Sequence, residues 1–160
     1  MSDVEAGEEF APTRLVLIRH GESVATQQRF IGGPRSCRGL TSLGREQAEA
    51  LRDRWMKAPE FGVDVLVASH FPRAIQTAEI IAPSLGDLAL EIIPGVGEHD
   101  PGPICDGLTY AEFEDRYGKE LDWNDPFREY FAGGETMSAF HHRVGTALHE
   151  IGRASCRERV

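Results

Sequence analysis

The stretch "LVLIRHGES", residues 15–23, decides the fold of this chain. Its first four residues form an uninterrupted apolar run, which is typical of a strand covered on both faces in a parallel sheet. An arginine, a histidine, a glycine and a glutamate follow directly. Ligands of parallel α/β sheets bind beyond the carboxyl ends of the strands. The stretch therefore predicts a strand over 14–18 that delivers Arg19 and His20 to a binding crevice.

Apolar strands and amphipathic helices alternate along the rest of the chain. This alternation predicts an α/β fold, a three-layer αβα sandwich with a mostly parallel central sheet and right-handed crossovers. Residues 94–107 are rich in glycine and proline and predict a long loop, a kind of segment that is often functional in compact domains. The remaining strands are expected over 63–68 and 90–93, and helices over 41–58, 71–82, 108–118 and 135–150.

Composition and charge exclude several classes of function. The 160 residues carry a net charge of -9 at pH 7, with 41% hydrophobic and 27% charged residues. This balance argues against a nucleic-acid partner or an anionic membrane surface, and no apolar run is long enough to span a membrane. Residues 1–13 lack the features of a secretion signal and predict a disordered acidic tail on a cytoplasmic protein. The three cysteines lack metal-ligand spacing, so no metal site is expected.

A second polar segment, "ASHFPRA" at 68–74, follows the strand predicted over 63–68. Since parallel strands end at the same edge of a sheet, Arg19 and Arg73 would bring two guanidinium groups beside His20. Guanidinium forks match the oxygens of a phosphate, and an imidazole can attack phosphorus in line. The sequence thus predicts a phosphoryl-transfer site in which arginines, not a metal ion, neutralise charge.

The proton for the leaving oxygen needs a separate source. A carboxylic acid suits this role, and Glu98 stands in the predicted loop after the third strand, with His99 and Asp100 as local alternatives. Gly21 would let the backbone approach an anion closely. The segment "WNDPFREYFAGG", 123–134, adds aromatic side chains that either cover the pocket or belong to the core.

The ordered set "RHGES", "LTSLGREQA", "SHFPRAIQTAEIIA", "EHD" and "GGET" resembles the histidine phosphatase superfamily, in its phosphoglycerate mutase-like branch. The resemblance extends from residue 14 to about residue 149. It implies that His20 is the phosphorylated nucleophile and that Glu98 is the proton donor that later activates water. It implies that Arg19 and Arg73 hold the phosphoryl group. It also implies substrate contacts at Gly21, Glu22, Ser23 and Thr26, the last standing where many members carry asparagine.

The family pattern also includes a second histidine, in a His-Gly pair after a further apolar strand, and this sequence has no such pair. The ending "IGRASCRERV", 151–160, reads like a translation of a common sequencing adapter, and its three arginines depart from the acidic body. We therefore expect an incomplete histidine phosphatase domain over 14–150, missing its C-terminal strand, and an artefactual tail over 151–160. On this expectation the 160-residue chain is weakly active or inactive and prone to aggregation.

Three functions stay open at this point. The first is hydrolysis of a small phosphorylated metabolite by a histidine acid-type phosphatase. The short connection between Arg73 and Glu98 favours it over a phosphoglycerate mutase-type phosphoryl transferase, which usually has longer insertions near the site. The third is a non-catalytic module that binds phosphorylated ligands, although binding alone needs neither a nucleophile nor an acid. The expected partner is a small-molecule phosphate ester, with no cofactor; the substrate and the oligomeric state stay open.

Overall fold

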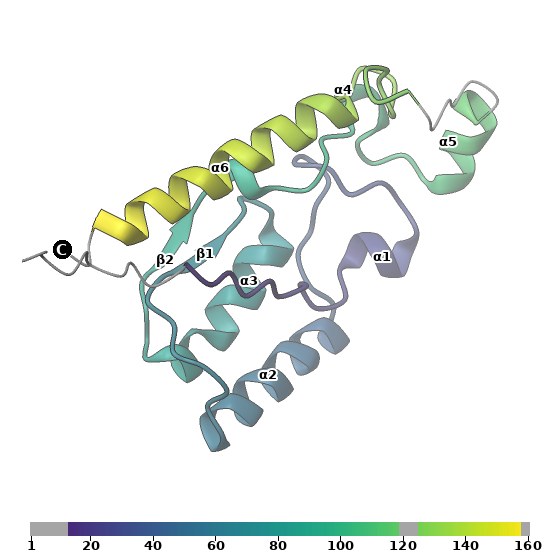
Figure 1. Ribbon diagram of the computed structural model, residues 1–160. Coiled ribbons are helices and arrows are strands. Elements are labelled where there is room, and N and C mark those ends of the chain that lie inside the picture. The colour runs from purple at the N-terminus through teal and green to yellow at the C-terminus, as the bar shows by residue number, and fades with distance from the viewer. Residues whose placement is uncertain (1–12, 119–124, 158–160) are drawn as a thin grey trace, which may run out of the picture.

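The computed structural model describes residues 13–118 and 125–157, with side chains up to residue 154. Apart from Thr13, the predicted disordered tail lies outside these residues. Strands β1 (Leu66–Ala68) and β2 (Leu90–Ile92) pair in parallel, with Leu66 opposite Leu90. Helix α3 (Pro72–Ile81) and the 3-10 helix η1 (Ala82–Leu85) connect them (Figure 1). The α/β class and two of the predicted strands are confirmed, each strand in a shortened form.

The predicted strand over 14–18 is wrong, because the structure describes this stretch and it forms no strand. Within the described residues, the sheet consists of two strands, β1 and β2. Leu17 is 85% exposed and Leu15 is 51% exposed. A parallel strand is stabilised by hydrogen bonds to neighbouring strands and by cover on both faces. An apolar run indicates a tendency to be buried, but it does not by itself supply a partner strand.

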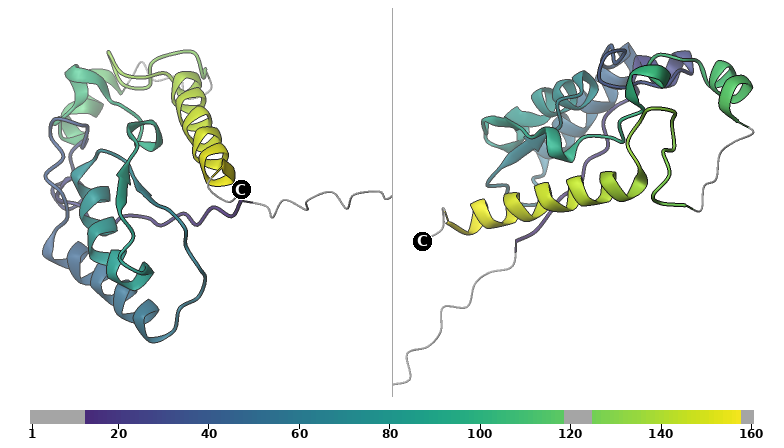
Figure 2. Two further views of the ribbon diagram at one scale, coloured as in Figure 1. Left: turned by 90° about the vertical axis from the view of Figure 1, so that its left-hand side faces the viewer. Right: turned by 90° about the horizontal axis from the view of Figure 1, so that it is seen from above.

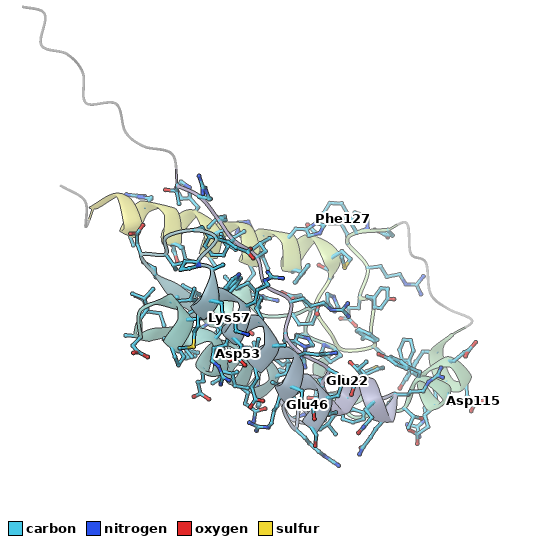
Figure 3. All side chains as sticks on the ribbon, turned by 90° about the horizontal axis from the view of Figure 1, so that it is seen from below. Glu22, Glu46, Asp53, Lys57, Asp115 and Phe127 are labelled. Atoms are coloured by element: carbon cyan, nitrogen blue, oxygen red, sulfur yellow. The ribbon has the colours of Figure 1, made fainter. Side chains whose placement is uncertain are left out.

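Helix α2 (Ser42–Lys57) packs beside α3 on one side of the strands (Figure 1). The Thr41 hydroxyl caps it by accepting a hydrogen bond from the backbone of Gly44, so the predicted start of this helix is confirmed. The helix buries Ala48 and Trp55 against the rest of the molecule. Its opposite face is charged and exposed, as the labelled side chains Glu46, Asp53 and Lys57 show in Figure 3.

The longest helix, α6 (Met137–Arg157), lies on the other side of the strands from α2 and α3 (Figure 2). It packs against the 3-10 helix η2 (Pro94–Val96). The predicted helix over 135–150 is therefore present, and it continues into the segment predicted to be an artefactual tail. Within the described residues, no helix has both the length and the apolar character required to cross a membrane.

Three shorter helices complete the described fold, and two of them contribute residues to a second small core. They are α1 (Val24–Gln28), α4 (Gly102–Cys105) and α5 (Tyr110–Tyr117). A capping box at Thr109 and Glu112 starts α5. The main core joins β1 to α3 through Leu66, Ala68 and Ala78, while the second gathers Ile31, Cys105 and Phe113.

Candidate active site

The "RHGES" segment is fixed between helices α2 and α3. The amide of Gly21 donates to the Thr77 hydroxyl on α3, over 3.2 Å. The amide of Glu22 donates to the Gln47 side chain on α2, over 2.8 Å, and the Glu22 carbonyl accepts from the amide of Thr41, over 3.0 Å. The 19–23 segment therefore lies against α3, the helix that carries Arg73 in its first turn.

Gly21 is required by a close approach of two backbones. A Cβ atom at Gly21 would lie 2.2 Å from the carbonyl oxygen of Gly44, and one at Gly44 would lie 2.1 Å from the carbonyl oxygen of Glu22. Side chains at either position would push α2 away from the segment that carries His20. The structure therefore gives Gly21 a packing role, besides the predicted approach of an anion, which stays a prediction.

The His20 imidazole has a defined hydrogen-bonding arrangement. Its Nδ1 lies 2.7 Å from the carbonyl oxygen of Gly21. A carbonyl can only accept, so Nδ1 carries the proton and Nε2 keeps its lone pair. Burial lowers the pKa of His20 below its usual 6.5, against the opposing effect of this hydrogen bond, and the charges of Arg73 and Arg19 lower it further. The neutral, nucleophilic form is therefore favoured at pH 7.

Arg73 and Arg19 differ in their surroundings. Arg73 is 6% exposed in the first turn of α3, and its guanidinium lies 4.3 Å from the centre of the Phe71 ring. One of its nitrogens donates to the Gly32 carbonyl over 2.9 Å and to the Cys37 sulfur over 3.3 Å. Arg19 is exposed. Both positive charges reach His20, since each lowers the pKa of the imidazole.

Residues 31–37, which we name the arginine-side loop because it contacts Arg73, are held by Asp106. The Asp106 side chain is 1% exposed and accepts from the amides of Gly33, Arg35 and Ser36 at 3.0, 2.8 and 3.3 Å. The Ser36 hydroxyl also donates to it. Burial alone would raise the pKa of Asp106, but the hydrogen bonds from Ser36, Arg35 and Gly33 outweigh it and lower the pKa.

Residues 94–100, which we name the acid loop, carry the three predicted proton donors. Glu98 is exposed, and its charge is near enough to raise the pKa of His20. Asp100 accepts from the amide of Gly102 over 2.9 Å. Both ring nitrogens of His99 are buried without a hydrogen-bond partner, and the ring packs against Tyr130, Phe131 and Phe140. The charge of Glu98 thus acts on His20, and its role as the acid stays a prediction.

The other predicted substrate contacts are engaged within the protein. Ser23 is 2% exposed and caps α1, accepting from the amide of Thr26 over 3.2 Å; the two hydroxyls lie 3.0 Å apart. The Glu22 carboxylate accepts from the Thr41 hydroxyl over 2.8 Å. These bonds give the three polar residues a role within the protein, and substrate contacts at Glu22, Ser23 and Thr26 stay predictions.

The aromatic residues near the site divide between core and surface. Phe131 packs against the second core, and Tyr130 is half-buried beside His99. Phe127 is 77% exposed and is labelled near the start of α6 in Figure 3. Trp123 lies outside the described residues. In the part of the chain that the structure describes, no three side chains of the metal-binding types are grouped to hold an ion.

Comparison with known proteins yields one family. The model of the histidine phosphatase superfamily (branch 1) matches residues 15–160. Phosphoglycerate mutase-like protein 4 of Arabidopsis thaliana is 30% identical over 91% of this chain and 63% of its own length. A 2,3-bisphosphoglycerate-dependent phosphoglycerate mutase of Parvibaculum lavamentivorans is 31% identical over 83% of this chain and 64% of its own length. The chain thus spans less than two thirds of these relatives.

Solved structures agree with this match. The alpha-ribazole phosphatase from Shigella flexneri has a TM-score of 0.72 and 26% identity, covering 86% of this chain and 66% of that one. A mycobacterial glucosyl-3-phosphoglycerate phosphatase in complex with VO3 has a TM-score of 0.69 and 25% identity, covering 84% of this chain and 62% of that one.

Proposed function

The chain belongs to branch 1 of the histidine phosphatase superfamily, and from this membership we propose that it is a phosphomonoester hydrolase whose nucleophile is His20. The substrate we propose is a small phosphorylated metabolite in the cytoplasm. The relatives and solved structures that it resembles are named as phosphatases and mutases, which supports an enzyme of the histidine phosphatase type.

One observation carries the proposal, namely the arrangement of the His20 imidazole. Its Nδ1–H donates to the Gly21 carbonyl over 2.7 Å, so the lone pair is on Nε2. In the first step Nε2 bonds to phosphorus and the bond from phosphorus to the ester oxygen breaks. Arg73 and Arg19 stabilise the charge on the remaining phosphoryl oxygens, and Glu98 gives its proton to the leaving oxygen.

The second step returns the enzyme to its first state. The Glu98 carboxylate, now without its proton, takes a proton from water, and the oxygen of that water attacks phosphorus. The bond from phosphorus to Nε2 breaks, inorganic phosphate leaves, and Glu98 is protonated again. Apart from the attacking water, each group that this cycle uses is a side chain described above.

Two other functions have specific observations in their favour or against them. Phosphoryl transfer to a second hydroxyl is the chemistry implied by the mutase names among the relatives. Against it, the chain between Arg73 and Glu98 holds only α3, η1, β2 and η2, with no insertion. A non-catalytic binding module would not need the Nε2 lone pair of His20 or the acid at position 98.

The test is to trap the phosphoenzyme. We expect the chain to incorporate acid-labile, alkali-stable phosphate from a labelled aryl phosphate, measured in a single turnover. His20→Ala abolishes the label, and His142→Ala, a control at an exposed histidine on α6, keeps it. Label that survives His20→Ala, or its absence from the unaltered chain, contradicts the proposal. Transfer of the label to added 3-phosphoglycerate, without release of phosphate, would favour the mutase.

A further inference from the structure

Arg143 on α6 uses all five of its side-chain N–H groups. Two donate to the carbonyl oxygens of Gly95 and Gly97, over 3.0 and 3.2 Å, and one to that of Glu98, over 3.3 Å. The other two donate to the carboxylate of Glu135, over 2.9 and 2.8 Å. A guanidinium has five donors in a fixed fork, so each of them has a partner here. Three of those partners are backbone groups of the acid loop.

Glu135 completes the attachment of the acid loop. Its carboxylate accepts from the amide of Asp100 over 3.3 Å, and its own amide donates to the carbonyl of Asp100 over 2.9 Å. The hydrogen bonds from Arg143 lower the pKa of Glu135, and those same bonds raise the pKa of Arg143. The Glu135 side chain is 13% exposed and that of Arg143 is 31% exposed, so the pair is partly shielded from water.

The acid loop has few other polar ties to the fold among the described residues. Its own backbone hydrogen bonds are local. The amide of Val96 donates to the carbonyl of Ile93, and the amide of Gly97 donates to the carbonyl of Pro94. Gly95 lies close to α6, since a Cβ there would be 2.7 Å from that of Ala147. The Glu98 side chain is exposed, and within the described part of the chain its hydrogen bond comes from the amide of His99, the next residue. The position of Glu98 therefore depends on the backbone that carries it.

We propose that Arg143 and Glu135 are positioning residues that fix the backbone of Glu98 so that its carboxyl group reaches the leaving oxygen. This inference rests on the proposed function. Proton transfer requires hydrogen-bond distance between the acid and the leaving group, and a displacement of about 1 Å can cost about a hundredfold in rate. Neither residue needs to touch the substrate for this effect.

The test compares two substrates that differ in their need for a proton. Phenyl phosphate has a poor leaving group and needs the acid, whereas 2,4-dinitrophenyl phosphate has a good leaving group and does not. We expect Glu98→Gln to slow phosphorylation of His20 by phenyl phosphate about a hundredfold and Arg143→Met to slow it about tenfold. Glu135→Gln has a smaller effect in the same direction. All three change the rate with 2,4-dinitrophenyl phosphate less than about threefold.

Arg116→Met, at an exposed arginine on α5, is the matched control and leaves both rates unchanged. A loss confined to phenyl phosphate cannot come from general damage to the fold, which would slow both reactions alike. Equal losses with both substrates, or no loss in Arg143→Met, would overturn the inference.

Hydrogen exchange provides a second readout that does not depend on activity. If the ion pair holds the acid loop, amides of residues 95–100 exchange faster in Arg143→Met than in the unaltered chain, and no faster in Arg116→Met. If the unaltered chain phosphorylates His20 with neither substrate, the proposed function fails. Unchanged exchange in Arg143→Met then overturns the positioning role separately.

Discussion

Two loops border the candidate site. One is held by a negatively charged side chain and the other by a positively charged one. The arginine-side loop is held by Asp106, an anion that accepts hydrogen bonds from three backbone amides. The acid loop is held by Arg143, a cation that donates to three backbone carbonyls. The first loop contacts Arg73 through the Gly32 carbonyl, and the second carries Glu98. Each charge thus supports one half of the proposed chemistry.

Asp106 and Arg143 differ in their bonding partners and in whether protonation can remove their charge. Asp106 is satisfied largely by amides and the hydroxyl of Ser36, and its ion-pair partner, Arg35, is exposed and 3.6 Å away. Arg143 instead forms a partly shielded, hydrogen-bonded pair with Glu135. Protonation removes the charge of a carboxylate, but a guanidinium stays charged at every pH that a folded protein meets. Acid therefore acts on the arginine-side loop directly, and on the acid loop only through Glu135.

The largest effect on stability is expected at Arg143. Arg143→Met leaves three loop carbonyls without this donor and the Glu135 carboxylate without its cation, with the amide of Asp100 as its remaining donor. Loss of one member of a shielded pair costs about 3 kcal/mol in the free energy of unfolding. Urea denaturation measures it, with Arg116→Met as the control near zero. A cost equal to that of the control would mean that the acid loop does not depend on Arg143.

Asp106→Asn tests the other loop and is expected to cost less. The amide keeps one acceptor oxygen but turns an NH2 group toward amide donors, so the loss is about 2 kcal/mol. Asp115→Asn, at an exposed carboxylate labelled in Figure 3, is the matched control and changes stability by less than about 0.5 kcal/mol. Equal effects of the two substitutions would contradict the assigned role of Asp106.

The cost of Asp106→Asn should depend on pH. The pKa of Asp106 in the folded protein is lowered from the usual 3.8, so its contribution is fully present above that value. The contribution is lost as the pH falls through the lowered pKa of the folded state. Urea denaturation of both proteins at pH 7, pH 4 and pH 3 should therefore show the difference shrinking on the acid side. If the difference in unfolding free energy grows toward acid pH, the pKa of Asp106 is raised in the folded protein and not lowered.

The smallest effect is expected in the titration of His20, which both loops influence. Arg73 lowers the pKa of His20 and Glu98 raises it. Arg73→Met should therefore raise the pKa of His20, and Glu98→Gln should lower it further. Titration of the His20 ring proton by NMR measures both. Shifts of the same sign would mean that the two loops do not act on the imidazole in opposite directions.

The sequence predicted the local elements well because their causes are local. The amphipathic pattern over 41–58 predicted α2, and the pattern over 71–82 predicted α3. The strand over 14–18 was wrong, since an apolar run carries no information about its partner strand. The roles of His20, Arg19, Arg73 and Glu98 were expected from a resemblance, and they stay proposals.

The two loop supports could not be read from the sequence at all. Gly33 and Asp106 are 73 residues apart, and Gly97 and Arg143 are 46 residues apart. Each bond joins a side chain to a backbone group. Because every residue has a backbone, the residue type at the backbone partner does not reveal the bond in the sequence. The "CDGLT" around Asp106 is what a polar turn would also contain. Such contacts become visible only once the chain path is known.

The contact between Gly21 and Gly44 makes the position of α2 a determinant of where the nucleophile sits. Because the two backbones are in contact, the segment that holds His20 cannot move closer to the first turn of the helix. The outer face of the same helix, with Glu46, Asp53 and Lys57, is free of this constraint (Figure 3). That face is therefore the place for a fluorescent label or a surface anchor, since chemistry attached there leaves the alignment of the imidazole intact.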